Sequence, residues 1–358
     1  MGPDDDPGAT RLRMMRGHLT PLWHATVSFG PRGRPLGAAT RAAIGLAVPL
    51  TVLVAADRLE WALYAGFGAF AAVYGRYDDH RKRMWVQLGA GTAIVVSMLL
   101  GTLLSYLDAP LIVRAAVIGV VAAVVAHLSF GLGWTPPGAI FAVFGGGACA
   151  SVPATAASFA AAAGVGAATV GFSVLVVIGL GLREMPLRDF GGRPPGWDPP
   201  PTAGTAALVM GVTAFLGGLA AIVALSGHWY WASVAALTAV TGQNTYFRLA
   251  RGVQRLAGTV VGVLVVGVLF LVGTPTAVLL VLAVICQAAV ELCIQWHYAI
   301  ASMFITLAAL IMVDLAAPQP PGGLITDRLM ETLIGVGVGC AVALASAAAT
   351  RLLGPTHR

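Results

Sequence analysis

The chain has 358 residues, of which 58% are hydrophobic and 10% are charged, whereas charged residues make up roughly a quarter of a soluble globular domain. This composition excludes an ordinary soluble domain and indicates a chain embedded in lipid. The formal net charge is +6, and because Lys82 is the single lysine, the positive charge comes from arginines. These arginines are spread over short turns between apolar runs, which indicates membrane topology rather than nucleic-acid binding.

The apolar runs predict an all-α membrane bundle of about twelve spans, since a helix needs roughly 20 apolar residues to cross a bilayer. The first six spans are expected at 38–56, 61–75, 86–107, 111–130, 137–152 and 158–182. The second six are expected at 204–226, 229–243, 255–273, 275–294, 298–313 and 330–352. The spans at 61–75, 137–152, 229–243 and 298–313 are short, so these four are the candidates for tilted, broken or re-entrant helices.

The distribution of charge sets the predicted organisation. With the N-terminus inside, cytoplasmic segments hold 18 of the 21 Lys and Arg residues, which supports both the even number of spans and this orientation. Both termini are therefore expected in the cytoplasm, and residues 1–37 lack the apolar core of a signal peptide. The predicted units are an N-terminal arm (1–37), a first transmembrane repeat (38–182), a linker rich in proline and glycine (183–203), a second repeat (204–352) and a tail (353–358).

An internal match supports the division into two repeats. Residues 72–92 align without a gap to residues 239–259, 167 positions further on, with nine identities in 21 positions. The identities include Gly75 with Gly242, and the run Ala90, Gly91, Thr92 with its counterpart 257–259. We interpret the chain as two copies of one membrane unit, with a substrate site expected between them at mid-membrane.

Several chemistries are excluded by the motifs. A phosphate-binding P-loop needs a lysine followed by serine or threonine, and Lys82 is followed by Arg83. The zincin, EF-hand and nucleophile-elbow patterns are also absent from the sequence. The four cysteines lie in apolar stretches without metal-ligand spacing, so they are expected to be buried thiols. We predict no enzymatic activity, no cofactor and no metal site.

Glu291 is the foremost candidate for a functional site, because an ionisable residue at the centre of a membrane helix costs roughly 2.5–3.5 kcal/mol on insertion scales and tends to face a cavity. Gln287, Glu291 and Gln295 recur every four residues, which predicts one shared helix face. This face would be a water-lined path or a polar contact between helices, with His297 as a proton partner. The alternative is that Glu291 is solvated near the cytoplasmic end and merely ends its span.

Other polar and aromatic residues extend this predicted path. Arg328 is a positive charge on the predicted outer side, against the topology trend, and is a candidate partner of Glu331 or of an anionic substrate. An ordinary surface ion pair is the alternative interpretation. Tyr64, Trp229 and Trp231 are expected to line the path or its outer mouth.

Four arginines are predicted at a cytoplasmic mouth. Arg81, Arg248, Arg251 and Arg255 lie in the basic clusters of the two halves, where they are topology anchors first. Because these clusters occupy equivalent places in the two halves, they are also expected to attract anions to a shared vestibule.

Two further predictions concern residues outside the path. Arg114 is expected to reach the interface with its long side chain, and His127 to be an interfacial histidine. Gly335, Gly337 and Gly339 are expected to allow close helix packing. The run Gly145–Gly147 is expected to do the same, or to unwind its span near a substrate.

The hairpin around the second basic cluster resembles the membrane hairpin of the fusaric acid resistance family of integral membrane transporters, which includes aromatic acid exporters. The residues that carry this resemblance are Tyr230-Trp231-Ala232, then Arg248, Arg251 and Arg255, then Gly258-Thr259-x-x-Gly262. The segment Asp327-Arg328-x-x-Glu331-Thr332-Leu333-Ile334-Gly335 resembles the closing span of that family.

The resemblance implies an inner-membrane exporter of small organic anions, often aromatic carboxylates, driven by the proton gradient. From its place in the apolar run, we expect Glu291 to take up and release the proton. Related plant anion channels have a similar scaffold and work as dimers, so a passive anion channel is one alternative and a homodimer is compatible with the small packing residues. A non-transporting scaffold or accessory subunit is a further alternative. The expected partners are the lipid bilayer and a small organic anion.

Overall fold

The computed structural model describes residues 20–31, 35–225, 227–242, 244–316 and 320–352. All regular structure in these ranges is helical. Nine of the described helices are long and apolar enough to cross a membrane. They are α2 (Leu36–Ala55), α4 (His80–Tyr106), α5 (Leu111–Gly131), α7 (Ala156–Gly181), α8 (Ala203–Ala224), α10 (Thr245–Leu271), α11 (Thr276–Cys293), α12 (Tyr298–Ala316) and α13 (Pro321–Leu352).

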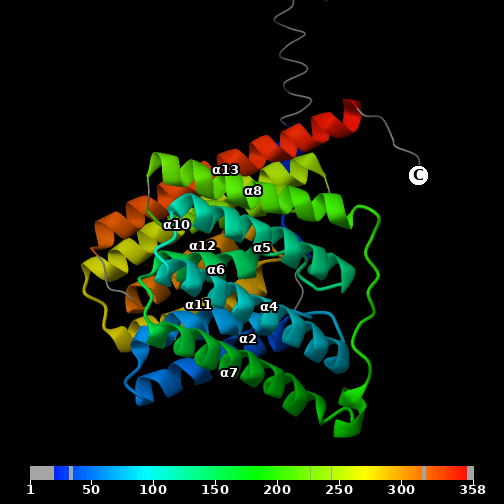
Figure 1. The fold of residues 1–358 in the computed structure, drawn as a ribbon, viewed down its shortest axis with the longest axis vertical. Coiled ribbons are helices and arrows are strands. Elements are labelled where there is room, and N and C mark those ends of the chain that lie inside the picture. The colour runs from blue at the N-terminus through cyan, green and yellow to red at the C-terminus, as the bar shows by residue number, and fades with distance from the viewer. Residues whose placement is uncertain (1–19, 32–34, 226, 243, 317–319, 353–358) are drawn as a thin grey trace, which may run out of the picture.

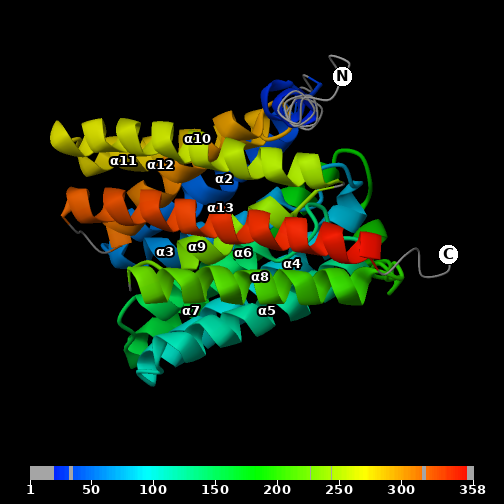
Figure 2. The ribbon, with the colours of Figure 1, turned by 90° about the horizontal axis from the view of Figure 1, so that it is seen from above.

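Three shorter helices lie in the interior, between the long ones (Figure 2). They are α3 (Ala62–Ala69), which has the 3₁₀ turns Leu59–Trp61 and Phe70–Val73 at its ends, α6 (Ile140–Ser151) and α9 (Tyr230–Val240). All eleven residues of α9 are buried. At 1.5 Å per residue α9 is only about 16 Å long, roughly half the thickness of a hydrocarbon core. The long helices surround it, so its apolar surface contacts protein on every side.

The predicted spans all correspond to helical segments, but several predicted boundaries were wrong. The span predicted as short at 298–313 is the full-length helix α12, which continues past Asp314 to Ala316. Helices α4, α10 and α13 each begin well before the expected residues 86, 255 and 330. The predicted spans began near the start of the apolar runs, whereas these helices also include charged residues that precede those runs.

Helices of the two halves pack across one another (Figure 1). Helix α8 of the second half lies against α5 of the first, and α2 of the first half lies against α11 of the second. Likewise α9 contacts α6, and α3 contacts α12. Within the halves, α4 packs on α6 and α7, while α10 packs on α12 and α13. The two halves therefore share one core, and neither is a separate domain.

The connections between helices gather at two ends of the bundle. We call the end that holds residues 74–79, 132–139, 182–202, 241–242, 244 and 294–297 the arginine-rich end, and the other the opposite end. Contacts between distant loops define the first: the Gly75 N–H donates to the Thr135 carbonyl at 2.7 Å, and the Asp198 N–H donates to the Gly131 carbonyl at 2.8 Å. Gly75 has a φ of +71°, a conformation that favours glycine in this turn.

The described part of the N-terminal arm is attached to the arginine-rich end. Residues 20–27 are helical, and the Thr26 carbonyl accepts a hydrogen bond from Gln254 Nε2 at 2.8 Å. The Phe29 ring lies 5.0 Å from the Trp296 ring. The Gly30 N–H donates to the Trp296 carbonyl at 2.8 Å. The arm therefore covers the connection between α11 and α12.

Glycines bring α13 into close contact with α9. A Cβ at Gly335 would collide with the carbonyl oxygen of Ala232, and one at Gly339 with that of Ala236, while a Cβ at Gly337 would meet nothing. The packing prediction is thus confirmed for two of the three glycines of this group. Gly145–Gly147 also pack closely, and they lie inside the continuous helix α6, so the alternative of an unwound span was wrong.

Candidate functional site

Two arginines of the second half lie in the protein interior. Arg328 on α13 is 0% exposed and Arg255 on α10 is 1% exposed. The guanidinium carbon of Arg328 lies 4.7 Å from the centre of the Trp231 ring, at the start of α9. Arg255, Glu331 and Tyr230 are within electrostatic range of Arg328. Helices α9, α10 and α13, which pack against one another, hold these groups together.

These arginines have unsatisfied donors. All three guanidinium nitrogens of Arg328, and Nε and Nη2 of Arg255, have no hydrogen-bond partner within the residues that the structure describes. A buried donor without an acceptor costs roughly 1–3 kcal/mol, and more when it is charged. Two like charges in one enclosed region add repulsion. This arrangement has the chemistry of an anion-binding site, since a carboxylate would supply acceptors and opposite charge at once.

A buried carboxylate lies beside this arginine pair. Glu331 is one turn after Arg328 on α13, is 0% exposed, and neither of its oxygens has a side-chain partner in the described ranges. Asp327, near the opposite end, forms a hydrogen bond with His228, with 3.0 Å between Oδ2 and Nδ1. The Asp327 and His228 side chains are 32% and 17% exposed. The interpretation of Arg328 and Glu331 as a surface ion pair was wrong, because both are fully enclosed by α9, α10 and α13.

The predicted aromatic residues are in the interior rather than at an outer mouth. Trp229 and Trp231 are 0% exposed, and the indole N–H of each has no acceptor in the described chain. Tyr230, between them, packs on Phe144 of α6 at 6.0 Å. Tyr64 is buried in α3, and no ring contact joins it to these tryptophans among the described residues. The aromatic residues of the candidate site therefore lie at the start of α9, and Trp231 faces the guanidinium of Arg328.

Glu291 lies in a second charged group, at the arginine-rich end. It is fully buried on α11 and forms an ion pair with Arg76, from the turn before α4. Arg41 of α2 is close enough to act on this pair electrostatically, and Arg83 of α4 is close enough to act on Arg41. The Arg83 guanidinium donates to the Gly75 carbonyl at 2.8 Å and also to the Asp78 carbonyl. This group joins elements of both halves, and Glu291 is not a solvated end of its span.

The prediction that three polar residues share one face of α11 was wrong for one of them. Gln287 is buried on α11 beside Glu291, but Gln295 is exposed and lies beyond the last residue of the helix, Cys293. Because the helix ends there, the four-residue spacing no longer places Gln295 on the same face. His297 contacts the N-terminal arm: its Nε2 is 3.2 Å from the Thr26 carbonyl.

The four arginines of the predicted mouth are separated. Arg81 donates to the Arg193 carbonyl at 3.3 Å, Arg248 donates to the Gly242 carbonyl at 3.1 Å, and Arg251 lies 4.1 Å from the Tyr298 ring centre. These three are at the arginine-rich end. Arg255 is not, because ten residues of α10 precede it, about 15 Å of helix.

Arg114 and His127 have structural contacts. Arg114 donates to the Ala109 carbonyl at 2.7 Å and to the Ala150 carbonyl at 2.5 Å, so it caps the last turn of α6 and does not reach out to the interface. The His127 ring packs edge-on against Trp197 of the linker at 5.2 Å.

Sequence reasoning missed Arg41 and Arg76. Arg41 was counted with the N-terminal arm, although it stands inside the first apolar span, and its side chain is 8% exposed. Arg76 was treated only as a member of the first basic cluster, a topology anchor that could also attract anions. The signal for Arg41 was present, because an arginine five residues into a membrane helix is costly unless it has partners. Nothing local in the sequence paired Arg76 with Glu291, 215 positions away.

A bundle with nine membrane-length helices and charged groups enclosed in its interior is a multi-pass membrane protein. Residues 202–342 match the family described as Fusaric acid resistance protein-like. This range covers α8 to most of α13, so the second half of the chain is similar to that family, and the resemblance predicted from the sequence is confirmed there.

One curated relative is the "Uncharacterized membrane protein YvaC" of Bacillus subtilis (strain 168), which is 29% identical over 135 residues. This match covers 37% of the present chain and 21% of the relative, so the chain spans about a fifth of that protein's length. No solved structure matches the chain. Among the described residues, no group of His, Cys, Asp or Glu side chains could hold a metal ion.

Proposed function

We propose that this protein is a secondary transporter of the inner membrane that exports small organic anions, aromatic carboxylates foremost. The observation that carries the proposal is the buried guanidinium of Arg328, which faces the Trp231 ring and has three donors without acceptors in the described chain. A carboxylate would accept from this guanidinium, and an aromatic ring beside it would pack on Trp231 and Tyr230. Arg255 adds a second positive charge to the same region.

We assign the proton-coupling role to Glu331 first. Glu331 is a fully buried carboxylate beside the proposed anion site, and its oxygens have no hydrogen-bond partner in the described ranges. The Asp327–His228 pair, partly exposed near the opposite end, would exchange protons between Glu331 and the solvent. Glu291 stays a candidate for the same role, but its ion pair with Arg76 would have to open before the carboxylate takes up a proton.

The arrangement of helices supports a transporter built from two repeats. The contact of α5 with α8 has its counterpart in that of α11 with α2, and the contact of α6 with α9 has its counterpart in that of α12 with α3. Such reciprocal pairs are what a two-fold relation between six-helix repeats would give. In this proposal the arginine-rich end and both termini lie in the cytoplasm, as the positive-inside distribution favours.

The test is the flux of labelled aromatic carboxylates into or out of liposomes that contain the purified protein, with and without an imposed pH gradient. We expect gradient-dependent flux of at least one acid for the wild type. In Glu331→Gln the dependence on the gradient should be lost, because glutamine cannot titrate. Glu291→Gln is the matched comparison, which should keep the dependence if Glu331 is the coupling residue.

The other outcomes decide between functions. Flux through the wild type that does not depend on the pH gradient would favour a passive anion channel over an exporter. Loss of coupling in Glu291→Gln alone would move the proton role to the arginine-rich end. No flux for any anion would favour a scaffold or accessory subunit, whose function should depend on the exposed arginines instead.

A further inference from the structure

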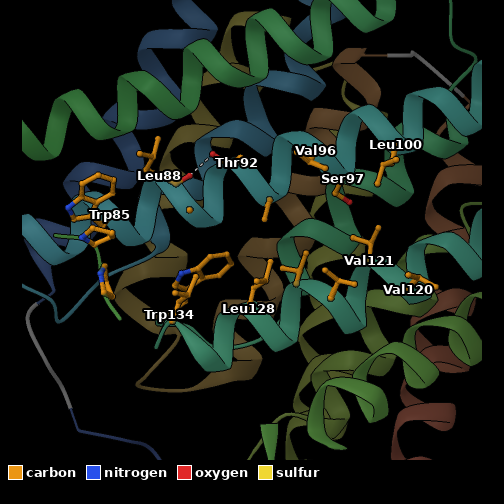
Figure 3. Close-up of a pocket in the computed structure, with 17 residues that line it drawn as sticks. Trp85, Leu88, Thr92, Val96, Ser97, Leu100, Val120, Val121, Leu128 and Trp134 are labelled. Atoms are coloured by element: carbon orange, nitrogen blue, oxygen red, sulfur yellow. Dashed lines mark hydrogen bonds between the residues drawn. The ribbon is translucent and has the colours of Figure 1, made fainter. Parts of the chain in front are cut away.

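A groove on the outside of the bundle runs between α4 and α5 (Figure 3). Its volume is about 630 Å³. Valine and leucine side chains of the two helices form its walls, including Val96, Val120 and Val124, which are 49%, 63% and 53% exposed. In Figure 3 the side chains labelled on α4 and on α5 follow the groove from Trp85 and Trp134 at one end to Leu100 and Val120 at the other.

The groove is long enough to hold the acyl chain of a lipid from one leaflet. It follows α4 from Trp85 to Leu100, fifteen residues further on, which is about 22 Å at 1.5 Å per residue. One leaflet of a hydrocarbon core is about 15 Å thick, half of about 30 Å. Three of the residues that line the α4 side are small, namely Gly89, Ala93 and Ser97. An extended acyl chain of one leaflet would therefore fit along the groove.

The two ends of the groove differ in charge. At the tryptophan end the linker passes over it, because Trp85 Nε1 donates to the Gly192 carbonyl at 3.1 Å and Arg81 donates to the Arg193 carbonyl at 3.3 Å. Arg81 is four residues before Trp85 and so on the same face of α4. Arg193 is exposed, and Pro194 and Pro195 line the groove. Around Leu100 and Val120, at the far end, the lining is apolar.

We propose that this groove binds one acyl chain of an anionic phospholipid, with the headgroup held by Arg81 and Arg193 beneath the linker. Basic groups at a membrane surface attract anionic headgroups, and the basic groups at the tryptophan end of the groove set which way the lipid points. The lipid would lie under the segment that joins the two halves. This site is separate from the proposed anion site of Arg328 and does not depend on transport.

Native mass spectrometry of the full-length protein, titrated with phosphatidylglycerol or phosphatidylcholine of the same chain length, tests the proposal. We expect one phosphatidylglycerol to be retained at least five-fold more strongly than phosphatidylcholine. Ala93→Phe, which places a ring in the groove, should lower this retention at least five-fold. The double variant Arg81→Gln, Arg193→Gln should bind both lipids equally.

The matched control is Ala168→Phe, the same substitution at an exposed alanine of α7 away from the groove. It should retain the lipid as the wild type does. If Ala93→Phe does not elute as a single species in gel filtration, Val124→Phe on the other wall replaces it. Equal retention of the two lipids by the wild type, or an equal loss in Ala93→Phe and Ala168→Phe, would overturn the proposal.

Discussion

At the scale of single residues, the interior of this protein holds charges in two different states. Arg76 and Glu291 neutralise each other in an ion pair, so they tie the two halves together. Arg328 and Arg255 have no such partner among the described side chains, so they destabilise the fold by themselves. A buried cation without an ion-pair partner among the described side chains is best explained by a role toward a ligand.

This distinction gives a prediction for Arg328→Met. Burying a charge whose donors have no acceptors costs free energy, so with an apolar side chain of similar length the melting temperature should stay equal or rise. Transport should nevertheless be lost, because the proposed carboxylate loses its partner. Melting in detergent and flux in liposomes measure the two effects.

Arg114→Met is the control for that prediction. The Arg114 guanidinium donates to two backbone carbonyls, so its loss should lower the free energy of unfolding by about 1–3 kcal/mol. A melting temperature that falls as far in Arg328→Met as in Arg114→Met would show that Arg328 has a structural role.

At the scale of secondary-structure elements, the short helix α9 positions the candidate site. Trp231 of α9 faces Arg328 of α13 because the two helices approach each other closely. Gly335 and Gly339 allow that approach because they have no side chain. Helices α9 and α13 therefore form a packed unit. Small residues make the contact between them, and the earlier turns of the two helices carry the charged and aromatic groups.

We expect Gly335→Leu to separate these helices. A side chain there meets the backbone of α9 and not the flexible end of a side chain, so overpacking should cost about 1–3 kcal/mol and lower transport as Trp231 and Arg328 move apart. Gly337→Leu, two residues away and facing open space, is the control and should melt as the wild type does. Thermal unfolding of both variants measures the difference; equal melting temperatures would contradict the packing argument.

At the scale of the whole molecule, the two halves exchange helix contacts and share one core. The first helix of each half packs on the fourth helix of the other, and an ion pair crosses between them. The described N-terminal arm adds a further link by covering the connection between α11 and α12. Motions that open one end of the bundle must therefore move parts of both halves together.

The proposed orientation can be measured with a pair of introduced cysteines, in a background where the four native cysteines are alanine. Tyr77 at the arginine-rich end is 69% exposed and Val272 at the opposite end is 71% exposed. In intact cells, a thiol reagent that cannot cross membranes should label Val272→Cys and not Tyr77→Cys. After lysis both should react; labelling of Tyr77→Cys in intact cells would reverse the orientation.

The sequence by itself determined the class of this protein and the approximate place of its helices, because insertion into a bilayer depends on local apolar length and on the charges of the turns. It also indicated Arg328, Glu331 and Glu291, since a charge in an apolar run is visible without any partner. Only the tertiary structure decided what surrounds them: that Trp231 is interior, that Arg255 is enclosed and that Glu291 pairs with Arg76. Such contacts join residues tens to hundreds of positions apart, and helix packing, which no local pattern encodes, brings them together.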